Sequence, residues 1–367
     1  MTGSDLVEMG QKRHIEPRPR EIRSGSEADI EGGYSDDHYV QKNCQITNAT
    51  FPEQGLPKAS LQMVSEEDTW WQYWPVNRGG AVNMSDMQFD QNAWLARIGY
   101  SGAVTPTLET LNRLIFAHAH SISYESLDIM LGRTPKLDVP TLQRKMIIGK
   151  RGGYCFEQNM LFRAGLRSLG YRITNLQGRV VRGLAIDAPR PAIHMLLQVE
   201  LSEGPYLADV GFGNLAPTCA LLLKPQIEQE TPHEVMRFID VGGELTLQAR
   251  LKHGWEHIYR VIPYPRYDGE YEITNWYTGT HPEAPYQGNI IAARPGPNRT
   301  RITMYNSRVT IRDVDGRADK RWLKNESEYR DVLRGEFGLN MTDEEIDQCV
   351  GVMKIKGTGD APHPFFA

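Results

Sequence analysis

A cysteine, a histidine and an aspartate in this sequence have types that could together carry out nucleophilic catalysis. Residues 151–159 read RGGYCFEQN, so Cys155 follows two glycines at the expected start of a helix. A thiol is a nucleophile only as the thiolate, which a helix N-terminus or a neighbouring imidazolium favours. Gly152 and Gly153 allow a tight entry with free backbone N–H groups. The alternative is that Cys155 is a small buried hydrophobic residue.

The two candidate partners lie downstream of Cys155. Odd-numbered positions from 195 to 201 are all apolar, which places His194 on the opposite face of an expected strand. A turn at residues 202–205 follows, and the next expected strand, residues 206–213, carries Asp209. Cys155, His194 and Asp209 would supply a nucleophile, a base and a group that orients the base.

The expected pairing of these two strands leaves a gap between His194 and Asp209. A hairpin centred on Glu203 and Gly204 pairs Asp209 with Gln198, so Asp209 and His194 share one face. They would nevertheless lie roughly 13 Å apart along the strand. Contact between them therefore requires a slipped register or a β-bulge.

The elements around these residues predict an α+β protein. Apolar residues follow a helical period from residue 94 to 98, from 108 to 115, from 142 to 147 and from 162 to 169, and Gly170 is placed to end the last helix. Short β-rich stretches follow at 173–181, 192–201 and 206–213, and near residues 245, 258, 290, 302 and 309. Residues 331–353 return to a helical pattern.

The first 86 residues differ in composition from the rest. They are polar and charged, with 8 Lys and Arg against 14 Asp and Glu, and lack a sustained apolar period. Residues 1–86 are therefore expected to be disordered or to form an atypical N-terminal extension. The aromatic run WWQYW at 70–74 is the exception, with docking, partner binding or no function as alternatives. Met84 and Met87 are alternative candidates for the natural start of the chain.

Composition excludes several classes of protein. No run of about 18 apolar residues predicts a transmembrane helix, and the N-terminus lacks the pattern of a secretory signal, so we expect a cytoplasmic protein. The net charge of −5 gives no reason to expect a nucleic-acid partner. The four cysteines are scattered, so neither a disulfide framework nor a metal site is expected. Cys44, Cys219 and Cys349 are interpreted as bystanders.

Several segments in order resemble the arylamine N-acetyltransferase family. They are RGGYCFEQN, His194 before an apolar strand, and DVGFGN at 209–214. SISYESLDI at 121–129 and NWYTGTHPEAPY at 275–286 resemble two further segments of that family. The resemblance runs from about Met87 to the C-terminal region. Arg151 and Glu157 fit the cysteine motif and are expected to support the site by ion pairing.

The resemblance implies a fold and a division into regions. The family fold comprises a helical bundle, a β barrel and an α/β lid, and belongs to the papain and transglutaminase superfamily. For this chain it implies a helical bundle with the nucleophile helix at 87–175, a β barrel at 176–272 and an α/β lid at 273–367.

The resemblance also implies a reaction. Cys155 would take an acetyl group from acetyl-coenzyme A (acetyl-CoA), with His194 as base and Asp209 as its orienter. An arylamine, arylhydrazine or arylhydroxylamine would then accept the acetyl group in a ping-pong mechanism. The expected partners are acetyl-CoA as co-substrate and a small aromatic amine or hydrazine, with no metal and no membrane, and a homo-oligomer is a candidate assembly.

Aromatic residues are implied to line the acceptor pocket, and this chain departs from the family at some of them. The implied pocket residues are Tyr124, Tyr154, Phe212 and Tyr286, and Phe212 and Gly213 are implied to lie near the coenzyme. Tyr124 replaces a phenylalanine, Ser126 an asparagine, and Pro285 and Tyr286 alter a Ser-x-Phe pattern. Two of the four pocket aromatics therefore gain a hydroxyl, which leaves the acceptor preference open.

Three alternatives keep parts of this interpretation. An amide synthase would use the same cysteine with an acyl chain delivered on a carrier protein. A cysteine hydrolase of the same superfamily would admit water to the acyl-enzyme. A non-enzymatic binding module would keep only the shape, which the presence of all three candidate catalytic residues argues against.

Overall fold

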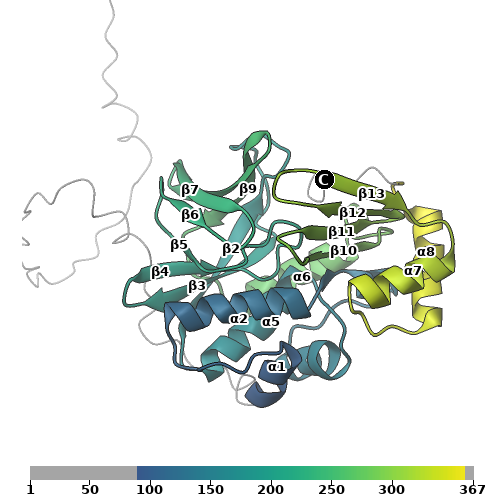
Figure 1. Cartoon of the computed structure of the whole chain (residues 1–367), viewed down its shortest axis with the longest axis horizontal. Helices are drawn as coiled ribbons and strands as arrows, with labels where there is room; N and C mark the ends of the chain where they lie inside the picture. Colours follow the sequence, from purple (N-terminus) through teal and green to yellow (C-terminus); the bar gives the residue numbers. More distant parts are fainter. Residues whose placement is uncertain (1–88, 360–367) are drawn as a thin grey trace, which may run out of the picture. The chain divides into compact units, whose positions relative to one another are not determined.

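The structure is a computed structural model that describes residues 89–359. All of these residues lie in one compact unit that spans residues 63–367. Helices and two antiparallel sheets make up the described part of the chain (Figure 1). The expectations for residues 1–86, including the aromatic run at 70–74 and the candidate starts, lie outside the described residues.

The first part of the described chain is helical, as the apolar period predicted. Trp94, Leu111 and Leu114 are fully buried in one cluster with apolar residues of the later helices. The predicted helix through residues 142–147 is present, but its second half has the wider π-helical turn. The helices are α1 (Gln91–Arg97), α2 (Leu108–Ser121), α3 (Leu127–Met130), α4 (Val139–Leu142), η4 (Gln143–Ile148) and α5 (Cys155–Ser168).

The larger sheet has eight strands in the order β5-β4-β3-β2-β9-β8-β7-β6. The strands are β2 (Arg172–Val180), β3 (His194–Leu201), β4 (Gly204–Ala208), β5 (Leu221–Leu222), β6 (Glu228–Glu230), β7 (Val235–Val241), β8 (Glu244–Leu251) and β9 (Gly254–Ile262). The side-chain amide of Gln229 on β6 bonds both backbone groups of Leu222 on β5, at 2.7 and 3.0 Å. The two edge strands therefore meet, and the sheet is nearly closed into a barrel.

Strand β3 separates two apolar cores. Met195, Leu197 and Val199 pack in the cluster that contains the helices, whereas Leu196 packs with residues of the other strands. This alternation confirms the predicted two faces of the strand. His194 is the first residue of β3, and its even position places it on the same face as Leu196.

The β3–β4 hairpin corrects the expected register. Leu197 pairs with Ala208 and Leu201 with Gly204, so the turn consists of Ser202 and Glu203 alone. Continued by one residue, this register puts Asp209 opposite Leu196 rather than Gln198, and so halves its expected offset from His194. Strand β4 ends at Ala208, so Asp209 lies just beyond the strand and not within it.

The second sheet joins the end of the chain to the helical part. It runs β1 (Tyr124–Glu125), β10 (Ile291–Pro295), β11 (Arg301–Tyr305), β12 (Arg308–Arg312) and β13 (Ala318–Trp322). The remaining helices are α6 (Asp268–Thr280), α7 (Glu326–Asp331), η5 (Val332–Glu336) and α8 (Asp343–Lys356). The predicted helix over residues 331–353 is wrong for 337–342, which separate η5 from α8.

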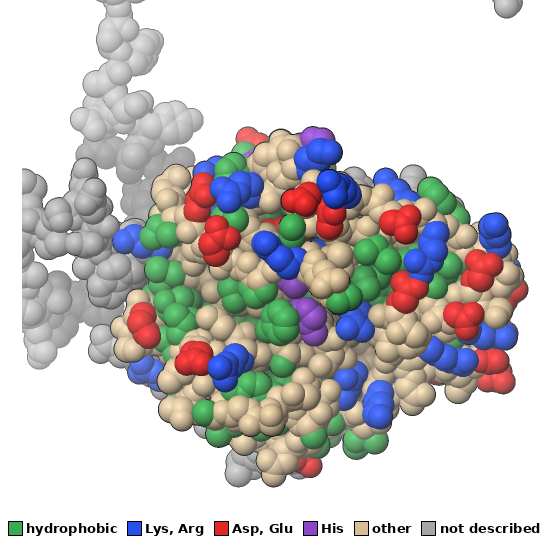
Figure 2. All heavy atoms as spheres, in the orientation of Figure 1, with side chains coloured by type: hydrophobic (Ala, Val, Ile, Leu, Met, Phe, Trp, Pro, Cys, Tyr) green, Lys and Arg blue, Asp and Glu red, His purple; other side chains and the backbone are tan. Residues whose placement is uncertain are grey.

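The C-terminal helices pack against the second sheet. Ala292 and Met304 of the sheet share a buried cluster with Leu333 and Ile346 of the helices. Among residues 89–359, no helix is long and apolar enough to cross a membrane. Charged side chains of both signs are interspersed over the face seen in Figure 2, so charge alone does not mark a site there. The division into three regions at 175/176 and 272/273 stays a prediction.

The glycines before Cys155 allow two backbone segments to pass close together. Glu125 on β1 donates its N–H to the Gly153 carbonyl, at 3.1 Å. A Cβ atom at Gly152 would lie 2.2 Å from the Ser123 carbonyl oxygen and 2.6 Å from Cγ of Glu125. The tight entry expected from the sequence is thus a close approach between β1 and the start of α5.

We expect Gly152→Ala to destabilise the protein by about 1–3 kcal/mol, because overpacking forces the backbone of β1 away from that of residue 152. Urea unfolding measures the difference. Gly351→Ala is the matched control, since Gly351 lies in α8 with nothing within 4 Å of its Cβ position. An equal effect of the two substitutions would contradict the close-approach explanation.

Candidate active site

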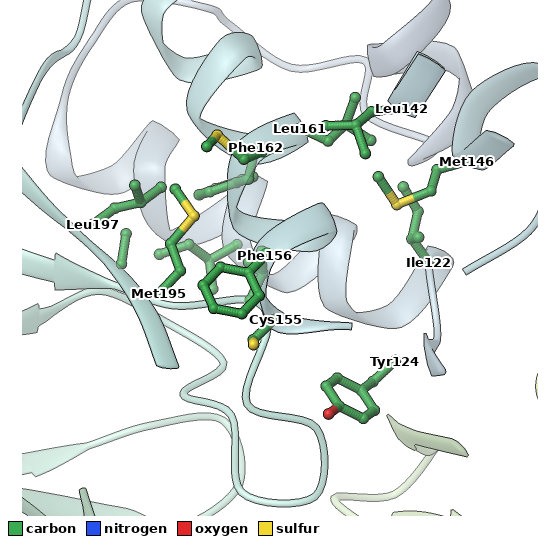
Figure 3. Packing of buried hydrophobic residues seen from close by; sticks show 14 of the residues in the cluster. Ile122, Tyr124, Leu142, Met146, Cys155, Phe156, Leu161, Phe162, Met195 and Leu197 are labelled. Carbon is green, nitrogen blue, oxygen red and sulfur yellow. The ribbon is translucent and has the colours of Figure 1, made fainter. Parts of the chain in front are cut away.

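Cys155 is the first residue of α5 and is 3% exposed. The backbone N–H of Tyr154, just before the helix, donates to the Glu157 carboxylate at 3.2 Å, which fixes the first turn. In Figure 3, Cys155 lies between the apolar side chains of Phe156 and Met195 and the ring of Tyr124. The cysteine therefore stands where the helix core meets β1.

The structure brings Cys155, His194 and Asp209 together. His194 Nε2 lies 2.8 Å from Oδ2 of Asp209. The thiol of Cys155 hydrogen-bonds with the His194 side chain. Because an ionised carboxylate can only accept, Nε2 carries a proton, and Nδ1 is the ring nitrogen left for the sulfur. The three side chains thus form one hydrogen-bonded chain, which the slipped register makes possible.

Asp209 is fully buried and accepts four hydrogen bonds. Oδ2 accepts from His194 and from the Tyr259 hydroxyl at 2.9 Å, and Oδ1 accepts from the Asn159 amide at 3.0 Å and the Gly211 N–H at 2.9 Å. Burial by itself would raise the pKa of Asp209, but the His194 charge and these hydrogen bonds outweigh it and lower the pKa. The carboxylate is therefore held ionised inside the protein.

His194 responds to the buried carboxylate in the opposite direction. Burial by itself would lower the pKa of His194, but the adjacent Asp209 and the hydrogen bonds to Asp209 and Cys155 raise it to about 10. The imidazole consequently has a strong tendency to take a proton from a neighbouring group. This is the property that a base beside a thiol requires.

An open cavity of about 360 Å³ lies over the cysteine. Its lining includes Cys155 and His194 together with Tyr124, Phe212 and Tyr286. The Phe212 ring stands edge-on to His194, with 5.1 Å between the ring centres. Three of the four aromatic residues predicted for an acceptor pocket therefore line one cavity with the thiol.

The two remaining predicted residues lie beside this cavity rather than in its lining. Tyr154 is fully buried behind Tyr286, with 5.5 Å between the ring centres, and its hydroxyl donates to the Asn275 side chain. Gly213 lines a neighbouring cavity of about 340 Å³ that shares Tyr124 with the first. Tyr154 thus supports the cavity wall, and Gly213 lies on the far side of Tyr124.

Ion pairs hold the start of α5 against β1, as expected for Arg151 and Glu157. Arg151 pairs with Glu125 at 3.2 Å and with Asp128 at 3.3 Å. Glu157 accepts from Lys145 at 2.7 Å. No group of three or more His, Cys, Asp and Glu side chains within residues 89–359 could hold a metal ion.

Sequence reasoning missed two residues that bind Asp209. Asn159 belongs to the quoted cysteine motif, and its position one helical turn after Cys155 was a signal that it faces the same side. It also accepts the Val210 N–H at 3.1 Å. Tyr259 lies on β9, 50 residues from Asp209, and no local pattern pointed to it.

A buried thiol, imidazole and carboxylate around one cavity define the class of cysteine-dependent enzymes that transfer acyl groups. Comparison with known proteins narrows this class. A family model described as N-acetyltransferase matches residues 107–346. The arylamine N-acetyltransferase of Escherichia coli K12 is 33% identical over 273 residues, which cover 74% of this chain and 97% of that protein. The enzyme of Mycobacterium tuberculosis H37Rv is 35% identical, covering 70% and 92%.

Solved structures agree with the sequence relatives. Mycobacterium marinum arylamine N-acetyltransferase superposes with a TM-score of 0.69 at 33% identity, over 72% of this chain and all of that chain. The same enzyme in complex with CoA gives a TM-score of 0.68. The chain belongs to the arylamine N-acetyltransferase family. The wider papain and transglutaminase relationship stays a prediction.

We expect Tyr259→Phe to lower the free energy of unfolding by about 1.5–3 kcal/mol, the range for a hydrogen bond to a charged group. Urea titration measures it. Tyr206→Phe on β4 is the control, because Tyr206 is also buried but does not bond Asp209. If the two variants lose equal stability, the Tyr259 hydroxyl does not stabilise the buried carboxylate.

The raised pKa of His194 predicts a dependence of stability on pH. A folded-state pKa of about 10 against an ordinary 6.5 means that the protonated imidazole stabilises the fold fully below pH 6.5. This contribution is lost as the pH rises through about 10. Urea titrations from pH 6.5 to 10 should show stability falling more steeply in the native protein than in Asp209→Asn. Equal slopes would argue against the coupling.

Proposed function

We propose that this protein transfers an acetyl group from acetyl-CoA to an aromatic amine, hydrazine or hydroxylamine by a ping-pong reaction through Cys155. His194 is the base, and Asp209 orients it. Family membership supports the overall reaction, and the CoA complex of the Mycobacterium marinum relative supports the donor. A cytoplasmic location and a homo-oligomer stay predictions.

In the first half-reaction, His194 Nδ1 takes the thiol proton and Cys155 Sγ attacks the carbonyl carbon of the acetyl-CoA thioester. A new S–C bond forms, the S–C bond to coenzyme A breaks, and the departing thiolate recovers the proton. Thioester exchange between two sulfurs is close to balanced in energy. The acetyl-enzyme therefore stores the activation of the donor.

In the second half-reaction, the amine nitrogen attacks the acetyl carbon. An N–C bond forms, the bond from Cys155 Sγ to the acetyl carbon breaks, and His194 takes the proton that the nitrogen loses. An aromatic amine is a weak nucleophile, so an acyl group activated on sulfur suits it. The aromatic lining of Tyr124, Phe212 and Tyr286 offers flat apolar surfaces to such a ring.

One observation carries this proposal above the others. The bond from His194 Nε2 to Asp209, at 2.8 Å, fixes the tautomer that leaves Nδ1 as an acceptor beside the thiol. A purely structural cysteine would not need a base held in this way. The amide-synthase and hydrolase alternatives share this chemistry and differ from the proposal in donor and acceptor.

Acylation without an acceptor tests the proposal. On mixing with acetyl-CoA, we expect a burst of free coenzyme A of about one per active site, and a mass gain of one acetyl group on the Cys155 peptide. Cys155→Ala should abolish both signals. Asp209→Asn should slow the burst by roughly 10³ to 10⁴, because the wrong imidazole tautomer would face the sulfur.

The alternatives predict other outcomes of the same experiment. A burst that is absent with acetyl-CoA and with other acyl-CoA donors would favour the carrier-dependent amide synthase. Continuous release of coenzyme A without an acceptor would indicate hydrolysis of the acyl-enzyme. A mere halving of the rate in Asp209→Asn would contradict the role given to Asp209.

A further inference from the structure

Two phenol hydroxyls meet on the wall of the cavity over Cys155. The hydroxyl oxygens of Tyr124 and Tyr286 are 3.0 Å apart and hydrogen-bonded. The two residues are 5% and 7% exposed, and both line the cavity with the thiol and His194. The hydroxyl pair therefore gives a polar spot to a wall that is otherwise aromatic and aliphatic.

The surrounding structure holds both rings in place. Tyr124 lies on β1, where its backbone pairs with Ala293 of β10. Tyr286 stands edge-on to Tyr154, whose hydroxyl is tied to the Asn275 side chain. Because each ring is fixed by elements outside the cavity, the hydroxyls stay at one position relative to the sulfur.

The hydroxyl pair can bind a third group. A phenol has one proton and two lone pairs. If Tyr124 donates to Tyr286, both lone pairs of Tyr124 remain available, and if it accepts, its proton and a lone pair remain. Burial, chiefly, raises the pKa of Tyr124 and of Tyr286, so both hydroxyls keep their protons at neutral pH. The Tyr124 oxygen can therefore accept from, or donate to, a polar atom in the cavity.

Charge in the cavity lining limits which polar atom fits. Besides His194, which Asp209 already balances, the lining is Tyr124, Cys155, Val180, Ile193, Gly211, Phe212 and Tyr286. Neither lysine nor arginine is among these described lining residues. A carboxylate on the aromatic ring would lose its hydration without gaining a cation, which is costly, whereas a neutral hydroxyl would only exchange one hydrogen bond for another.

We infer that the Tyr124–Tyr286 hydroxyl pair selects acceptor amines whose aromatic ring carries a neutral hydroxyl, over rings with an ether or a carboxylate in its place. This inference rests on the proposed function, since it names the acceptor class of the same site. A site that hydrogen-bonds a substrate hydroxyl rejects analogues that lack it, because its own polar groups are then left unpaired.

Two acceptors of similar electron donation test the inference. 4-Aminophenol and 4-methoxyaniline differ in the hydroxyl proton, so the ratio of their kcat/KM values reports hydrogen bonding to the ring substituent. We expect this ratio to fall by roughly 2- to 12-fold in Tyr286→Phe and in Tyr124→Phe, the range for one neutral hydrogen bond. Tyr206→Phe, outside the cavity lining, should leave the ratio unchanged.

The acylation burst separates failure of the inference from failure of the proposed function. An intact burst with a ratio that is unchanged in both cavity variants overturns the inference and leaves the acetyl transfer standing. 4-Aminobenzoate with a higher kcat/KM than 4-aminophenol also overturns it. If no burst occurs, calorimetric binding of the products, 4-acetamidophenol and 4-methoxyacetanilide, gives the same ratio without turnover, and equal effects of the variants on both ligands refute the inference.

Discussion

The buried carboxylate of Asp209 is the constraint around which the site is built. A charge removed from water is costly unless charged or polar partners surround it. Here the four partners come from four places in the chain: His194 on β3, Asn159 on α5, Tyr259 on β9 and the N–H of Gly211. The helix and the barrel must both be in place before the carboxylate is satisfied, so folding and assembly of the site are one event.

The second constraint is the close passage of β1 beside the start of α5. Gly152 leaves no room for a side chain, and the ion pairs of Arg151 and Glu157 hold the two segments together. Strand β1 also begins the second sheet, so the same contact places Tyr124 over the sulfur. The nucleophile and one wall of its cavity are thus fixed by a single junction.

Periodicity and local chemistry accounted for much of this arrangement before any coordinates. The apolar odd positions of β3 placed His194 on the face of Leu196, and the glycines before Cys155 marked the start of α5. The expected offset between His194 and Asp209 was wrong by two residues, because turn residues with similar propensities leave the centre of a hairpin ambiguous. The side on which Asp209 lies survived this error, since a shift of two residues preserves the face of a strand.

By itself the sequence determined the kinds of element, the faces of the strands and the three residues able to act together, because these follow from side-chain type and short-range spacing. Only the tertiary structure decided that Tyr259 reaches Asp209, that Tyr154 lies behind the cavity and that the hydroxyls of Tyr124 and Tyr286 bond each other. Each of these contacts joins residues more than 45 positions apart, with partners set by how strands and helices close on one another. Local propensity carries no information about such closure.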